Sequence, residues 1–276
     1  MSTWLITGCS SGLGRALAEA VLAAGHQAVV TARDEVKVAD LAGGAAERVL
    51  TAGLDVTDVA QVTDVVRRAE DRFGGIDVLV NNAGYGYRAA VEEGGDADVR
   101  ALFDTHFFGA VAMVQAVLPG MRARRSGAIV NISSIGAQLT PPGSGYYSAA
   151  KAAVEGMSGS LRAELAPLGI SVTVVEPGGF RTDFAGRSLT QSSTVIDDYA
   201  ETAGQRRKER DTRHGTQPGD PARAGQAILT ALESGRTPAM LLLGTDALSA
   251  YRRVLTAALA EADDWEDLST STDFGA

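Results

Sequence analysis

The chain has 276 residues, of which 45% are hydrophobic and 21% are charged, with a formal net charge of −9 and a sequence pI near 4.9. This composition can build a large core and is unlike that of a disordered chain, and the acidic balance argues against nucleic acid as a partner, because phosphate backbones attract clustered Lys and Arg. The single cysteine, Cys9, cannot form an internal disulfide, so nothing requires an oxidising compartment.

Targeting, membrane and metal signals are not evident in the sequence. Met1 leads into strand-like residues without a basic region, and no apolar run reaches about 18 residues, so we expect a cytoplasmic protein with no membrane segment. The three histidines are scattered and no Cys/His ligand spacing occurs, so we expect no metal site. These histidines are His26, His106 and His214.

Along the chain, short apolar segments alternate with longer segments of helical periodicity. The predicted strands are Thr3–Thr7, Gln27–Ala32, Arg48–Leu54, Asp77–Val80, Gly127–Ile132, Ile170–Glu176 and Ala239–Leu243. The predicted helices include Gly14–Ala24, Val59–Phe73, Ala97–Arg124 and Tyr147–Pro167. Because the strands lack polar alternation, they predict one α/β domain over residues 1–276, with a doubly wound, seven-stranded parallel sheet covered by helices on both faces.

The pattern changes after Glu176, because residues 178–219 are rich in Ser, Thr, Asp and Arg and have no strong apolar stripe. One interpretation is a mobile substrate lid, and the other is a solvated pair of helices, since charge runs such as Arg206–Asp211 usually face water. The last residues, 263–276, are acidic and rich in Ser and Thr, so we expect a frayed tail there.

A glycine-rich turn follows the first strand and opens the first helix. Glycine permits positive φ and close approach to a pyrophosphate, and the N–H groups and dipole of the helix N-terminus attract the anion. A plain tight turn is the alternative, but the position at the first strand-to-helix turn of a parallel sheet favours a dinucleotide. The residues predicted to hold it are Gly8, Ser10, Ser11, Gly12, Leu13 and Gly14.

The end of the second strand indicates which dinucleotide binds. An acidic residue near this point would hold the ribose 2′-hydroxyl of NAD, but the strand ends in Ala32 and Arg33 follows. A guanidinium can accept a 2′-phosphate through paired charge-assisted hydrogen bonds, so we expect NADP(H). The alternative is a surface arginine that begins the next helix, and Asp34 beside it would weaken a phosphate site.

Tyr147 and Lys151 lie four residues apart at the start of a predicted helix, so both face one bound molecule. A positive charge about 5 Å from the phenol favours phenolate by about 3 kcal/mol, or about two pKa units, and we expect Lys151 to bring Tyr147 into the range of acid/base catalysis. Upstream, Ser133 and Ser134 end a strand, where serine serves either as a turn residue or as a ligand for a substrate oxygen.

Taken together, these motifs resemble the short-chain dehydrogenase/reductase family, in particular its hydroxysteroid-dehydrogenase-like branch. The resemblance extends from about Thr3 to Phe184 and includes the Thr-Gly-x-x-x-Gly-x-Gly turn at Thr7–Gly14. It implies a Rossmann-type fold and selects Ser134 as the catalytic serine that stabilises charge on the substrate oxygen, with Tyr147 and Lys151. The further cofactor contacts that it implies, besides Tyr147 and Lys151 themselves, are Asp55, Val56, Asn81, Ala83, Gly84, Pro177, Gly178, Phe180 and Thr182.

His106 departs from the family pattern, because the family usually has an asparagine there that supports a water-linked proton relay to the lysine. Histidine also donates and accepts hydrogen bonds and titrates near physiological pH, so a relay with altered pH dependence is one interpretation. A packed helix residue is the other.

These features predict hydride transfer between NADP(H) and a hydrophobic ketone or secondary alcohol, with Tyr147 as the acid/base group. The substrate is expected between residues 138–146 and 184–199, where Leu139, Pro141, Pro142 and Tyr146 suggest an apolar wall. The alternative is an NADP(H)-binding sensor with little turnover. The resemblance also implies a homodimer or homotetramer formed through the helices Ala97–Arg124 and Tyr147–Pro167.

Overall fold

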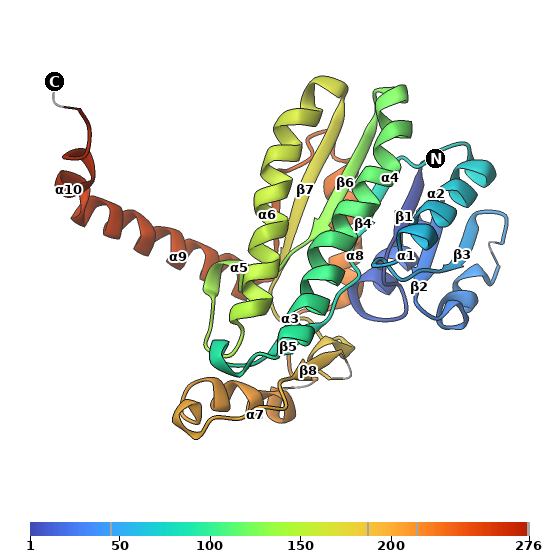
Figure 1. The fold of residues 1–276 in the computed structure, drawn as a ribbon. Coiled ribbons are helices and arrows are strands. Elements are labelled where there is room, and N and C mark those ends of the chain that lie inside the picture. The colour runs from blue at the N-terminus through green and yellow to red at the C-terminus, as the bar shows by residue number, and fades with distance from the viewer. Residues whose placement is uncertain (45, 187, 214, 275–276) are drawn as a thin grey trace.

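The fold of the chain is known from a computed structural model, which describes residues 1–44, 46–186, 188–213 and 215–274 (Figure 1). Its centre is a seven-stranded, fully parallel sheet in the order β3-β2-β1-β4-β6-β7-β9. The strands are β1 (Thr3–Ile6), β2 (Gln27–Ala32), β3 (Val49–Gly53), β4 (Val78–Asn81), β6 (Gly127–Ile132), β7 (Ile170–Pro177) and β9 (Met240–Leu243). Each predicted strand boundary lies within one residue of these, and the predicted doubly wound fold is confirmed.

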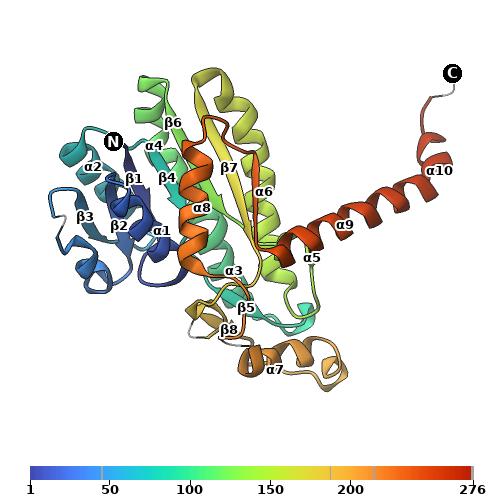
Figure 2. The same cartoon turned by 180° about the vertical axis from the view of Figure 1, so that it is seen from behind.

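Helices cover both faces of the sheet, which explains why its strands are apolar throughout (Figures 1 and 2). Trp4 and Ile6 enter the core beneath one helix layer, and Leu5 between them enters the other core. The first layer contains α1 (Gly12–Ala23) and α8 (Pro221–Glu233), and the second contains α2 (Val59–Phe73), α4 (Gly109–Arg124) and α6 (Gly145–Leu165). The other α-helices are α3 (Asp96–Phe103), α5 (Gly136–Leu139), α7 (Ala203–Arg213), α9 (Thr245–Asp264) and α10 (Glu266–Thr270).

The order of the strands creates a crevice at one edge of the sheet. β1 pairs with β2 on one side and with β4 on the other, so the chain reverses its direction of winding there. In such sheets ligands bind beyond the carboxyl ends of the strands at this switch point. The segments that follow β1, β4, β6 and β7 all begin at that edge, and they carry the predicted site residues.

The single helix predicted over residues 97–124 is in fact interrupted. A π-helical turn, Asp104–Phe108, separates α3 from α4. By length and composition alone, the continuous helical run Asp96–Arg124 could cross a membrane, which corrects the expectation that no such apolar segment exists. In this fold 39% of its most apolar window is buried, and α4 packs on β4 and β6 as a core helix does.

Two segments depart from the simple alternation of strands and helices. Residues 178–219, where a lid or a solvated helix pair was predicted, contain strand β8 (Leu189–Gln191), short 3-10 turns and α7. β8 pairs in parallel with β5 (Gly86–Arg88) in a separate two-stranded sheet. The predicted tail contains α10, which continues α9 away from the body of the protein (Figures 1 and 2). His214 lies outside the described residues.

Candidate active site

The glycine turn after β1 leaves no room for side chains. Gly8 and Gly12 have φ values of +72° and +63°, which L-residues with a Cβ rarely adopt. A Cβ on Gly8 would lie 2.9 Å from the Cα of Ala83, and one on Gly14 would lie 2.2 Å from the Nδ2 of Asn82. The predicted glycines are therefore needed both for backbone conformation and for close packing against the segment after β4.

Two residues that the sequence reasoning did not single out, Thr7 and Asn82, hold this turn in place. Thr7 Oγ1 accepts hydrogen bonds from the backbone N–H groups of Asn82 and Ala83, each at 2.9 Å. The amide of Asn82 donates to the carbonyl oxygens of Thr7 and Gly8 at 2.9 and 3.1 Å. Both lie inside the quoted motifs, but only the structure shows that they link β1 to β4 at the switch point.

The turn opens directly onto the N-terminus of α1. Ser11 precedes the helix in an extended conformation and its side chain makes no capping hydrogen bond, so the first helical N–H groups have no side-chain cap. Thr182 lies over this turn, since a Cβ on Gly12 would be 3.4 Å from the Cβ of Thr182. Open backbone donors, positive φ and the positive end of the helix dipole fit a diphosphate.

Arg33 and Asp55 lie after β2 and β3, on the opposite side of β1 from β4 and β6. Arg33 is exposed at the end of β2. The carboxylate of Asp34 accepts from Val36 N at 3.2 Å and lies 3.9 Å from Lys37 Nζ, so it caps its own 3-10 helix, Glu35–Ala42. Asp55 accepts from the backbone and hydroxyl of Thr57 at 3.0 and 2.7 Å, which fixes the loop after β3.

Tyr147, Ser134 and Lys151 converge at the ends of β6 and α6. Ser134 Oγ accepts from Gly136 N at 3.0 Å and hydrogen-bonds the phenol of Tyr147. Lys151 is buried, its Nζ donates to Ile132 O at 2.7 Å and lies 5.8 Å from the centre of the Tyr147 ring. The structure thus brings together the three residues that the motifs selected.

The protonation states of this pair differ from the prediction. Burial raises the pKa of Tyr147 to about 12, although the hydrogen bond from Ser134 opposes the rise. Burial also lowers the pKa of Lys151 to about 8, and the charge of Glu155 opposes that fall. The predicted lowering of the phenol pKa by the ammonium is therefore wrong for this structure, because loss of hydration on burial is the largest influence on this group. Tyr147 is a neutral hydrogen-bond donor at neutral pH.

His106 lies in the π-helical turn and is buried against Tyr147, with the two rings edge-on and their centroids 5.6 Å apart. Its Nε2 is 2.7 Å from the carbonyl oxygen of Tyr85, and its Nδ1 makes no hydrogen bond to any residue that the structure describes. Burial, and then the charge of Lys151, lowers the pKa of His106 well below 6.5. The imidazole is neutral, which corrects the expectation that it titrates near physiological pH.

A small cavity joins His106 to Lys151. Its volume is about 10 Å³, close to the space that one water molecule needs. Val56 and Asn81, both predicted to contact the cofactor, line it as well, and Asn81 donates to Asn131 Oδ1 at 2.9 Å. Gly84 packs closely against the imidazole, because a Cβ on it would lie 2.4 Å from His106 Cε1.

Two carboxyl groups that the sequence reasoning missed lie next to the candidate catalytic residues. The amide of Gln138 donates to Glu155 at 2.8 Å and to Glu176 at 3.2 Å, and Ser133 Oγ donates to Glu155. Burial and the nearby charge of Glu155 raise the pKa of Glu176 to about 7, so the two groups are not both fully ionised at neutral pH. For Glu155 the sequence offered one signal, which is its position one helical turn after Lys151.

The segment after β7 is anchored at the root of α9. A Cβ on Gly178 would lie 2.2 Å from Asp246 Oδ1, and Asp246 Oδ2 accepts from Gly179 N at 2.7 Å. Phe180 then forms a parallel bridge with Gly219. Pro177 and Gly178 are thereby held at the edge of the sheet, where the carbonyl oxygen of Pro177 also accepts from Ile135 N at 3.2 Å.

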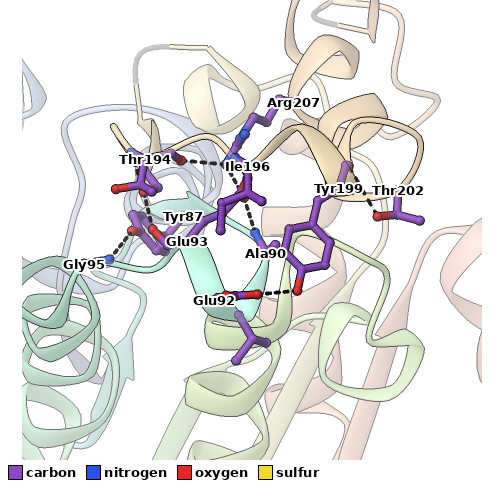
Figure 3. Close-up of polar contacts among 12 residues, drawn as sticks. Tyr87, Ala90, Glu92, Glu93, Gly95, Thr194, Ile196, Tyr199, Thr202 and Arg207 are labelled. Carbon is purple, nitrogen blue, oxygen red and sulfur yellow. Dashed lines mark hydrogen bonds and ion pairs between the residues drawn. The ribbon is translucent and has the colours of Figure 1, made fainter.

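The segment of residues 178–219, which we call the cover, is held by the buried carboxylate of Glu93 (Figure 3). We call Glu93 and its partner Arg207 the clasp. Glu93 accepts from Ile196 N at 2.9 Å and from Ala90 N at 2.8 Å and forms an ion pair with Arg207. Burial would raise the pKa of Glu93, but these donors lower it below 4.5. In the same segment, the Phe184 ring lies 5.8 Å from that of Tyr147.

Comparison with known proteins places this site in a family. The family model described as short chain dehydrogenase matches residues 2–193. Oxidoreductase BOA17 of Botryotinia fuckeliana is 38% identical over 270 residues, or 98% of each chain. The 3-ketodihydrosphingosine reductase of Bacteroides thetaiotaomicron is 39% identical over 217 residues, or 78% of each chain.

Solved structures agree with this assignment. A short-chain dehydrogenase from Streptomyces avermitilis has a TM-score of 0.92 at 43% identity, over 99% of this chain and 100% of that one. One from Burkholderia cenocepacia, in complex with NADP, has a TM-score of 0.74 at 28% identity, over 95% and 96%. The fold and site define an oxidoreductase of the Rossmann type. The chain belongs to the short-chain dehydrogenase family.

Proposed function

We propose that the protein is an NADP(H)-dependent oxidoreductase that interconverts hydrophobic ketones and secondary alcohols, with Tyr147 as the acid/base group. The observation that carries the proposal is the convergence of a neutral phenol, the Ser134 hydroxyl and the buried ammonium of Lys151 beside the glycine turn. When bound, the nicotinamide supplies or accepts the hydride. Tyr147 donates a proton to the carbonyl oxygen, Ser134 hydrogen-bonds it, and Lys151 restrains the phenolate that remains.

The residues present fit the dinucleotide. The diphosphate would lie on the turn Gly8–Gly14 and the N-terminus of α1, and the adenosine beside Asp55. The exposed Arg33 would bind a 2′-phosphate. The carboxylate of Asp34 caps its own 3-10 helix and so leaves the guanidinium of Arg33 available. The nicotinamide end would meet Pro177, Gly178 and Thr182. These contacts support NADP(H), as does the NADP complex of the Burkholderia relative.

The substrate proposal rests on the side chains around Tyr147. Phe184 packs on its ring and is 39% exposed, and Leu139 at the end of α5 is 36% exposed, so apolar surface borders the phenol. One relative is a reductase of 3-ketodihydrosphingosine, which supports an apolar carbonyl substrate here. In this proposal His106 Nδ1 and Lys151 share one water in the small cavity, which would return a proton to Tyr147.

We place the protein in the cytoplasm as a homodimer or homotetramer. A groove of about 280 Å³ separates α4 from α6 on the outer face, and it supports pairing of this face with that of a second copy. Its apolar lining includes Phe107, Val111, Leu118, Met157 and Leu161.

The test is NADPH consumption by the purified protein with a panel of aryl, steroidal and long-chain ketones. We expect turnover that Tyr147→Phe lowers by about 10³-fold, and a preference for NADPH over NADH that Arg33→Ala removes. Tight NADPH binding without turnover on every ketone would overturn the enzyme proposal and favour a nucleotide sensor. Equal use of both cofactors by the unaltered protein would overturn the proposed role of Arg33.

A further inference from the structure

The C-terminal arm, α9 with α10, leaves the body of the protein and extends into solvent (Figures 1 and 2). Its first turns are anchored, since Ala247 and Ala250 are buried, but every described residue from Leu255 onward is exposed. The fully exposed part of α9, from Leu255 to Asp264, is ten residues long, and an isolated helix of that length is marginal in water, so this part gains stability from a partner. The arm is therefore a candidate interaction surface.

Three large apolar side chains form a stripe along α9. Leu248, Leu255 and Leu259 are 39%, 45% and 67% exposed. At 3.6 residues per turn, these positions fall within about 40° of arc on one face of the helix, and Ala262 continues the stripe. Such a contiguous apolar surface marks an interaction site rather than an ordinary solvated helix.

The charges on the arm indicate what occupies this stripe. Arg252 and Arg253 lie in the first half of α9, whereas Glu261, Asp263 and Asp264 lie in its second half. A second copy of the same helix, placed antiparallel, sets the basic half of each helix against the acidic half of the other. A parallel arrangement would instead set Arg252 against its own copy and would concentrate the acidic residues at one end.

We propose that α9 forms an antiparallel pair with α9 of a second copy, related by a two-fold axis that crosses the helix at the level of Ala257. In that register Leu255 of one copy meets Leu259 of the other, so four leucines surround the axis. The same register places Arg252 beside Ala262 and Asp263 of the second copy. A two-fold interface must be self-complementary in this way, and a single helix satisfies the condition here with both apolar and charged residues.

The proposed α9 pair begins close to the active site. Asp246, in the first turn of α9, holds the Gly178–Gly179 segment, and α9 packs on α5 after Ser134. The antiparallel register brings the end of the second copy's arm beside Leu248, close to this root. The arm face differs from the α4–α6 face, so use of both faces would give a tetramer of two-fold pairs.

The first experiment compares two double variants by light scattering. Leu255→Asp/Leu259→Asp places two charges in the stripe, and Ala257→Asp/Ala260→Asp places the same charges on the far side of the helix, where both alanines are exposed. We expect the stripe variant to halve the molecular mass and the control to leave it unchanged. An unchanged mass for the stripe variant would overturn the proposal. Because the stripe is exposed within one copy, the charges should not unfold that copy. Thermal melting checks that both variants fold.

The second experiment tests orientation with cysteine pairs. Cys9 is fully buried, so introduced thiols are the accessible ones. Arg252→Cys/Ala262→Cys should form a disulfide between copies, because these positions meet in the antiparallel register, whereas within one helix they lie about 15 Å apart, too far for a disulfide. The single variants should stay uncrosslinked. A disulfide formed by Arg252→Cys alone would show a parallel pair and overturn the proposed orientation, as would failure of the double variant to crosslink.

Discussion

The edge of the sheet that carries the candidate active site and the segment that covers it are held in place by different kinds of contact. At the edge, Ser134 and Tyr147 belong to short motifs whose positions follow from the ends of β6 and the start of α6. The cover depends on contacts between distant parts of the chain, since Glu93 binds residues that are 103 and 114 positions away. Substitutions at the edge should therefore affect the chemical step or cofactor binding, and substitutions in the clasp should affect substrate binding.

The largest effect should come from Tyr147→Phe. Removal of the phenolic hydroxyl eliminates the proton donor, and general acid/base groups contribute about 10² to 10⁴-fold, so we expect kcat to fall by about 10³-fold. NADPH affinity, measured by fluorescence titration, should change little because the glycine turn remains intact. Loss of cofactor binding in parallel with activity would show that Tyr147 acts through structure rather than chemistry.

Gly14→Ala should weaken NADPH binding by about tenfold to a hundredfold, or about 1.4 to 2.8 kcal/mol. The added Cβ would lie 2.2 Å from Asn82 Nδ2 and 2.6 Å from the carbonyl oxygen of Gly8, so the turn has to open. Gly159→Ala in α6 is the matched control, because its Cβ meets nothing within 4 Å and alanine favours a helix. Calorimetric titration of both variants checks the prediction, and equal affinities would contradict it.

The two regions also differ in how far the sequence predicts them. The strands, the glycine turn and the Tyr147–Lys151 pair are readable because period, turn chemistry and helical spacing are local properties. The protonation states of Tyr147 and His106 are not, because they depend on burial by rings that come from other elements. The same holds for Glu93, whose partner Arg207 appears in the sequence only as part of a charge run.

Glu93→Gln tests the clasp. A buried ion pair that loses one charge leaves the other uncompensated, so we expect the 178–219 segment to be cleaved by trypsin about tenfold faster and KM for an apolar ketone to rise several-fold, with kcat nearly unchanged. Because the pKa of Glu93 is below 4.5, the clasp stabilises the fold above that pH and is lost as the pH falls through the lower, folded-state pKa.

Its control is Glu92→Gln, which removes an exposed carboxylate that accepts from Tyr199 at 2.6 Å. Exposed contacts of this kind contribute little, so cleavage and KM should match those of the unaltered protein. If Glu93→Gln were cleaved no faster than this control, the clasp would not be what holds the cover.

The smallest predicted effect lies where the two regions meet, at Glu155 beside Lys151. Lys151, with a pKa of about 8, stabilises phenolate only while it is protonated, so the rate of reduction should decline as the pH rises through about 8. The charge of Glu155 raises that pKa, whereas burial lowers it, and His106 on the other side is neutral. Glu155→Gln should therefore shift the declining limb of the pH profile to lower pH and leave the rate near pH 6 almost unchanged.

Glu164→Gln is the control, because Glu164 is exposed on the same helix, and it should not move the declining limb. A limb that stays in place would mean that Glu155, with Glu176 and Gln138, only braces the strand ends, and that the ammonium is controlled by burial alone.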